Sequence, residues 1–206
     1  MHHRIKNNLQ LVSSLLFIKS THQKDPDLKK FIERNKHREV ESFKKDGVRF
    51  SYKVYAYTHA IDNCSSDVDG LICIDADSVF YKSIDVNWIK KHIHKDDCMM
   101  SYLGRGSNYS ECGFLYFNMQ HNETRNYARY MKKMYDYDEI YSLSEYHDSY
   151  VWDYVRKVFE EDMKVKNNNI GDNRPGHVQA RSILGTVYDH TKGKRKLTGK
   201  SPEVNL

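Results

Sequence analysis

Two acidic residues, Asp75 and Asp77, follow a short apolar run and are separated by one residue. The run at residues 71–74 is typical of a strand covered on both faces of a parallel α/β sheet. Ligands of open α/β sheets bind beyond the carboxyl ends of the strands. Carboxylates there suit Mg²⁺ or Mn²⁺, and such an ion neutralises a departing diphosphate. A pair of helix-capping or turn residues is an equal alternative for the tripeptide alone.

A second set of residues lies near the end of the chain, at His190, Gly193 and Lys196. His190 could add a nitrogen ligand to the same ion. Gly193 would let the backbone come close to a phosphate, and Lys196 could contact phosphates as a point charge. Taken alone, the stretch also fits a basic tail with an incidental histidine.

Two further polar residues, Asn118 and Asp148, are the candidate catalytic residues. Asn118 ends an expected strand, and its amide could reach sugar hydroxyls. Asp148 begins an expected helix, where capping and the helix dipole favour an acid. A carboxylate in that position could also face a pocket and bind sugar or acceptor hydroxyls. An ordinary core strand and a simple capping residue are the alternatives.

The elements that must position these residues alternate between strand and helix, which favours the α/β class. Apolar spacing predicts an N-terminal helix through Ile5, Leu9, Val12 and Leu16. Pro26 suits the first turn of a second helix. Further helices are expected at about 48–61, 123–135 and 145–161, strands at 71–74, 99–103 and 113–118, and a loop at 164–176.

Size and composition limit the class of protein. The 206 residues fit one domain, or one domain with a short extension. The net charge of +5 is mild, and acidic residues interleave with basic ones, so an anionic small ligand fits at least as well as a nucleic acid, which is not expected as a partner. The cysteines form no C-x-x-C pair, which favours free thiols and a reducing, cytoplasmic location. No apolar run reaches membrane-spanning length.

These motifs and their order resemble those of the retaining GT-A glycosyltransferases of the glycogenin and bacterial lipooligosaccharide galactosyltransferase type. Those families place a D-x-D after an apolar strand, then a strand ending in Phe-Asn, an acid at a helix start, and a final H-x-x-G-x-K. The matching positions are Asp75 and Asp77, Phe117 and Asn118, Asp148, and His190 with Gly193 and Lys196. Residues 48–54 resemble the helix that offers a basic residue to the nucleotide. The resemblance covers about residues 17–196.

That resemblance implies a GT-A-like mixed sheet flanked by helices and a metal-dependent, retaining transfer of a sugar. Asp75, Asp77 and His190 would hold Mn²⁺ or Mg²⁺. The donor would be a nucleotide-sugar, with a UDP-sugar as first choice, and the acceptor a glycan or another hydroxyl compound. The residues that would contact the nucleotide are Lys53, Arg49, Gly193 and Lys196.

The chain departs from this family at both ends. The family's last motif continues into proline and tryptophan, whereas Leu197 and Thr198 stand here. GT-A domains begin with a strand that helps to hold the base, and none is expected before Phe17. The first strand is therefore expected to be missing or replaced by a helix.

Residues 2–16 resemble the phosphoacceptor helix of a sensor histidine-kinase family, with His3 as the phosphorylated residue and a dimer formed through the helix. The ATP-binding motifs of such kinases do not follow in the required order. The expected divisions are a helix at 1–16, a GT-A-like domain at 17–196 and a flexible tail at 197–206. A chimeric or truncated start is favoured over a working phosphoacceptor, and an inactive glycosyltransferase relic is a third reading.

Overall fold

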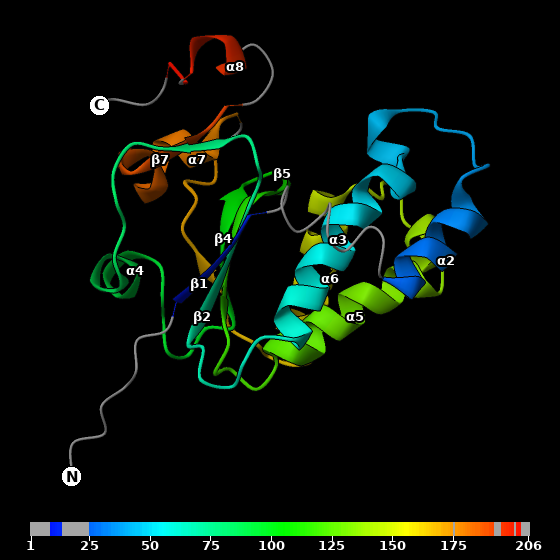
Figure 1. Ribbon diagram of the computed structural model, residues 1–206, viewed down its shortest axis with the longest axis horizontal. Helices are drawn as coiled ribbons and strands as arrows, with labels where there is room; N and C mark the ends of the chain where they lie inside the picture. The colour runs from blue at the N-terminus through cyan, green and yellow to red at the C-terminus, as the bar shows by residue number, and fades with distance from the viewer. Residues whose placement is uncertain (1–8, 14–24, 175, 192–194, 200, 203–206) are drawn as a thin grey trace.

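A five-stranded mixed sheet with helices on both faces organises the chain (Figure 1). The computed structural model describes residues 9–13, 25–174, 176–191, 195–199 and 201–202. The α/β class predicted from the sequence is confirmed. The strands follow the order β1 (Leu9–Ser13), β2 (Gly70–Ile74), β5 (Asn108–Asn118), β4 (Met100–Arg105) and β6 (Asn168–Asn169). β1 is parallel to β2, β5 is antiparallel to both β2 and β4, and β6 is parallel to β4.

Residues 9–13 are a strand, and the prediction of a helix there is wrong. β1 pairs along its whole length with β2, from Leu9 opposite Gly70 to Ser13 opposite Ile74. A run of five residues is too short for apolar spacing to separate a helix from a strand, and pairing with a neighbouring strand decides the outcome. The expectation of a missing first strand is corrected by the same finding. Ile5 and Leu16, the ends of the expected apolar stripe, lie outside the described residues.

Four helices form a layer on one face of the sheet (Figure 1): α2 (Pro26–Asn35), α3 (Gly47–Asp62), α5 (Thr124–Asp136) and α6 (Asp148–Asp162). α2 begins as expected, because the Asp25 carboxylate accepts the N–H groups of Asp27 and Leu28. Phe31 of α2 is fully buried against Tyr55 and Tyr135. This helical layer and the sheet share one large core.

Smaller elements cover the other face: α4 (Val86–His92), α7 (Val178–Arg181), and a two-stranded ribbon of β3 (Ser78–Phe80) and β7 (Tyr188–His190). Leu71 and Cys73 of β2 point into the larger core, and Ile72 and Ile74 into the second. β2 is therefore buried on both faces, as its apolar run predicts. The remaining short helices are η1 (Phe43–Lys45), η2 (Glu139–Ser142), η3 (Ile183–Thr186) and α8 (Arg195–Thr198).

Two expectations for loops and tails need correction. The stretch at 164–176 contains β6, whose Asn168 and Asn169 pair with β4. The expected tail contains the end of α8, and Ser201 is fully buried because its N–H and hydroxyl bond to Asp189. In the part of the chain that the structure describes, every helix is too short or too polar to cross a bilayer.

Candidate active site

Asp75 and Asp77 follow the carboxyl end of β2, where the chain passes from the sheet into the β3–β7 ribbon. The Asp75 N–H donates to the carbonyl of Gly113 on β5, at 3.1 Å. The Asp77 carbonyl accepts both the N–H and the hydroxyl of Thr191, each at 3.0 Å. The backbone of the D-x-D segment is therefore held between β5 and the residue that follows β7.

His190, the last residue of β7, lies against both aspartates. Its Nε2 is 2.8 Å from Asp77 Oδ1 and 3.4 Å from Asp75 Oδ2. The ring is 1 % exposed, and its Nδ1 has no hydrogen-bond partner among the described residues. An unsatisfied buried nitrogen beside carboxylates points to a missing ion, water or ligand. The structure thus brings together the three residues that the sequence analysis assigned to a metal.

Gly113 makes room for the His190 ring. A Cβ added at Gly113 would lie 2.3 Å from Nδ1 of His190 and 3.2 Å from Oε1 of Glu111. The pairing of β5 with β4 is irregular here, since Tyr116 pairs with Ser101 but Glu111 pairs with Leu103. Bulges of this kind re-aim side chains beside functional sites.

Glu111 is a site residue to which the sequence analysis gives no role. Single ligand atoms of Asp75, Glu111 and His190 lie within 4.8 Å of one another. Two donors on one ion, each about 2.1 Å away, are at most about 4.2 Å apart, so only a small adjustment is needed. The sequence signal was an acid shortly before Gly113 and the apolar run at 114–117. Glu111 is 6 % exposed and lies 3.4 Å from Arg105.

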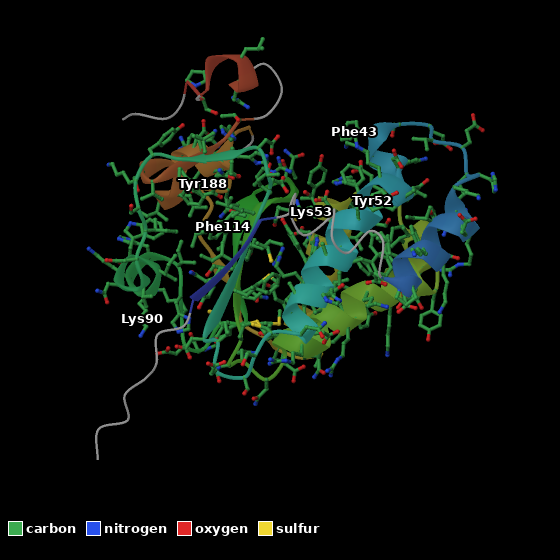
Figure 2. All side chains as sticks on the ribbon, in the orientation of Figure 1. Phe43, Tyr52, Lys53, Lys90, Phe114 and Tyr188 are labelled. Carbon is green, nitrogen blue, oxygen red and sulfur yellow. The ribbon has the colours of Figure 1, made fainter. Side chains whose placement is uncertain are left out.

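Lys53 of α3 ties two carboxylates together beneath this cluster. Its Nζ lies 2.6 Å from Asp75 Oδ1, 2.8 Å from Asp148 Oδ2 and 2.9 Å from the carbonyl oxygen of Cys112. An ammonium group has three protons, and these acceptors can use all of them. The contacts favour a positioning role over the diphosphate contact expected from the sequence. Figure 2 shows Lys53 on the opposite side of the sheet from Tyr188.

The electrostatics of Lys53 and Asp148 agree with this pairing. Burial alone would lower the pKa of Lys53, but Asp148 and Asp75 raise it well above its ordinary value. Burial alone would raise the pKa of Asp148, but the Lys53 charge and hydrogen bonds hold it well below its usual range. Both groups are therefore charged near neutral pH. Asp148, in the first turn of α6, is joined to the cluster through Lys53.

Asn118 does not reach this cluster. It pairs with Gly70 at the amino end of β2, whereas Phe114 pairs with Ile74 at the carboxyl end. Four strand residues, or about 13 Å, separate the two ends. The Asn118 amide donates instead to the carbonyls of Asp96 and Cys98.

Three residues expected to contact the nucleotide remain: Arg49, Gly193 and Lys196. Arg49 is exposed on α3, one turn before Lys53 and therefore on the same side of the helix. Gly193 lies outside the described residues. Lys196 belongs to α8, and its side chain is not among those that the structure describes.

A group of rings, termed the aromatic patch, lies next to Asp148. The imidazole of His147 has its centroid 4.3 Å from the ring of Tyr109, 5.9 Å from Phe50 and 6.2 Å from Tyr150. His147 is buried, whereas the other three rings are partly exposed. Such a surface presents flat apolar faces together with polar tips.

The donor set fits a divalent cation. Asp75 and Glu111 offer carboxylate oxygens, and His190 a nitrogen, within 4.8 Å of one another, and an Asp77 oxygen lies 2.8 Å from His190 Nε2. Lys53 contacts Asp75, and Arg105 contacts Glu111. Carboxylates suit Mg²⁺ and Mn²⁺, and an imidazole in the set favours the transition metal. A bound ion would also balance the excess negative charge.

Comparisons with known proteins add two findings. A family model described as histidine kinase matches residues 1–44. A solved structure described as a glycosyltransferase involved in the glycosylation of the major capsid of PBCV-1 is similar, at 9 % identity and a TM-score of 0.49, over 93 % of this chain and 99 % of that one. At this TM-score the likeness of shape is distant and assigns no function. No curated protein matches the sequence.

Proposed function

We propose that this chain is a metal-dependent glycosyltransferase that moves a sugar from a nucleotide-sugar to an acceptor hydroxyl. One observation carries the proposal: Asp75 and Asp77, at the carboxyl end of a buried strand, meet His190 from a segment 113 residues later in the chain. Two carboxylates alone would repel a diphosphate. With a divalent cation held between them, the same residues attract it.

The residues around that ion would have two roles, as metal ligands and as a positioning residue. Asp75, Asp77 and His190 would hold it, with Glu111 as an additional ligand, and the ion would stabilise the departing diphosphate. Lys53 fixes the directions of Asp75 and Asp148 through its contacts at 2.6 and 2.8 Å.

Residues beside this cluster would bind the donor and the acceptor. Asp148 would accept hydrogen bonds from sugar hydroxyls, and the aromatic patch beside it would receive an acceptor sugar, because aromatic rings line many ligand sites. Arg49, Gly193 and Lys196 remain the proposed contacts of the nucleotide. A UDP-sugar is the proposed donor, and retention of configuration follows from the family resemblance.

The proposal is tested by donor turnover. Purified protein is incubated with a panel of UDP-sugars and Mn²⁺, with and without a chelator, and release of UDP is measured. We expect release with at least one sugar, lost with the chelator and in Asp75→Asn. Release that survives both changes would contradict the proposed chemistry, and binding without any release would favour the inactive relic.

A second candidate function is that of a histidine phosphoacceptor, which the match of residues 1–44 to the histidine-kinase model favours. The proposed acceptor, His3, lies outside the described residues. Residues 26–35, however, form α2, whose Leu28 and Phe31 are buried in the core of the α/β fold. This packing favours a single folded unit over a separate signalling helix pair.

A phosphate-labelling experiment distinguishes the glycosyltransferase from the histidine phosphoacceptor. The chain is mixed with a histidine-kinase catalytic domain and labelled ATP, alongside His3→Ala. We expect no label on either protein. An acid-labile phosphate present on the wild type and absent from His3→Ala would establish the second function.

A further inference from the structure

A fully buried carboxylate, Asp189, lies directly before His190 in β7. Its Oδ1 lies 2.9 Å from Nε2 of His177 and accepts hydrogen bonds from the Ser201 hydroxyl at 3.0 Å and the His190 N–H at 2.8 Å. Its Oδ2 accepts the Ser201 N–H. Three separate segments of the chain are thus joined at one side chain.

The arrangement of serine, histidine and aspartate here is not a nucleophilic site. Ser201 donates its hydroxyl proton to Asp189, and His177 bonds to the same carboxylate oxygen. A nucleophilic serine needs a base that takes its proton and needs access to substrate. Ser201 is fully buried, so the group connects parts of the fold.

The connected parts are those that carry the candidate metal residues. The same carboxylate that holds Ser201 also fixes the main chain at His190, whose Nε2 faces Asp77 at 2.8 Å. On the other side of His190, Thr191 is bonded twice to the Asp77 carbonyl. The backbone of His190 is therefore held on both sides, by Asp189 with Ser201 and by Thr191 with Asp77.

We propose that Ser201 and Asp189 are positioning residues of the metal site, which hold His190 in the place where it meets Asp75 and Asp77. The inference rests on the proposed function. It makes Ser201 part of the site, although Ser201 lies eleven positions after His190 in the chain. Outer partners that orient metal ligands commonly change metal affinity by about 10- to 100-fold when removed.

The experiment measures Mn²⁺ binding to the full chain by electron paramagnetic resonance. Ser201→Ala removes only the hydroxyl bond and keeps the N–H bond, so the fold should persist. Ser201→Thr retains the hydroxyl. Thr186→Ala is the matched control, because Thr186 is exposed and, within the described part of the chain, its hydroxyl bonds to the nearby Ile183 carbonyl alone. Thermal unfolding confirms that each variant is folded.

We expect Mn²⁺ to bind about tenfold more weakly to Ser201→Ala, with affinity restored in Ser201→Thr and unchanged in Thr186→Ala. The imidazole resonances of His190, recorded without metal, should shift in Ser201→Ala and not in the control. Wild-type affinity together with unshifted resonances in Ser201→Ala would overturn the inference.

A wild-type chain that binds no Mn²⁺ would count against the proposed function. The positioning role would then be tested by the His190 resonances alone, because these are recorded without metal. Unchanged resonances in Ser201→Ala would overturn that role, and a shift confined to Ser201→Ala would support it.

Discussion

Polar and charged side chains gather at both ends of the β2–β5 strand pair, but their hydrogen bonding differs between the two ends. At the amino end of β2, Asn118 donates to the carbonyls of Asp96 and Cys98. The hydroxyl of Tyr116 lies 2.7 Å from Nδ1 of His94. The other nitrogen of that ring lies 2.8 Å from the Asp96 carboxylate. Asn118, Tyr116 and His94 are thus satisfied by neighbouring side chains and by the backbone, although one carboxylate oxygen of Asp69, just before β2, is buried without a partner among the described residues.

At the carboxyl end, three carboxylates gather around one imidazole, and Arg105 pairs with one of them, Glu111, at 3.4 Å. Asp75 and Asp77 share one imidazole nitrogen of His190, and Glu111 lies close by. Lys53 is bonded to Asp75, and the second nitrogen of His190 is buried without a partner among the described residues.

The difference separates a structural cluster from a binding site. Buried polar groups in native proteins are normally paired, and strongly perturbed or unsatisfied groups gather where ligands bind. Asn118 fits the first description, and the cluster around His190 fits the second. Substitutions at the carboxyl end should therefore change ligand binding, and those at the amino end should change only stability.

The largest effect on metal binding is expected for Asp75→Asn. The substitution removes a negative ligand from the proposed metal site, and Mn²⁺ affinity should fall by about 100-fold or more, equivalent to about 2.7 kcal/mol. Electron paramagnetic resonance of free Mn²⁺ measures the affinity. Asp162→Asn, at the exposed end of α6, is the control and should bind as the wild type does. Equal Mn²⁺ affinities in Asp75→Asn and Asp162→Asn would show that the carboxyl end of β2 is not a metal site.

Lys53→Met should cause the largest loss of stability. It leaves the buried Asp148 and the half-buried Asp75 without their cation, which costs about 3 kcal/mol and lowers Tm by roughly 10 °C. In the folded protein the pKa of Asp148 lies below its ordinary value of 3.8. The pair therefore stabilises the fold above that pH and loses its effect as pH falls below it.

Thermal unfolding at pH 7 and pH 3 measures this change. The difference in Tm between the wild type and Lys53→Met should be smaller at pH 3. A difference that is independent of pH would show that Lys53 acts through packing and not through its charge.

Gly113→Ala should have an intermediate effect that is confined to the site. The added methyl would lie 2.3 Å from Nδ1 of His190, so the ring must move. Mn²⁺ affinity should fall about tenfold, as expected for a displaced ligand. A crystal structure of the variant checks the ring position, and an unmoved His190 with full affinity would contradict the geometry described here.

The smallest effect on binding is expected for Asn118→Ala. Loss of its hydrogen bonds should destabilise the fold by about 1–3 kcal/mol. Affinity for Mn²⁺ and for UDP, corrected for the folded fraction, should match the wild type. Weaker binding of Mn²⁺ or UDP would show that Asn118 acts in the active site, as the sequence motif predicts.

Much of the helical layer could be predicted from the sequence. The helix expected at 48–61 is observed as Gly47–Asp62, and that expected at 123–135 as Thr124–Asp136. Apolar residues at helical spacing predict both helices, and the Asp46 carboxylate caps the first by accepting the Arg49 N–H. Residues 9–13 could not be assigned in this way, because their strand state depends on pairing with β2, which lies some 60 residues later.

The candidate site was predictable in part. The resemblance of the ordered motifs to GT-A families predicts that Asp75, Asp77 and His190 come together. The place of Asn118 depends on the antiparallel direction of β5, which the sequence pattern does not reveal. Glu111 enters the cluster through the irregular pairing of β5 with β4, and Lys53 meets Asp148 only through packing of α3 on the sheet.

Calorimetric titration of UDP into the protein, with and without Mn²⁺, tests the central claim most directly. The wild type should bind UDP only in the presence of the metal, and Asp77→Asn, which preserves the shape of the side chain, should lose most of that binding. UDP binding of equal strength without Mn²⁺, or in Asp77→Asn, would contradict the assignment of Asp75, Asp77 and His190 as a metal site for a nucleotide-sugar.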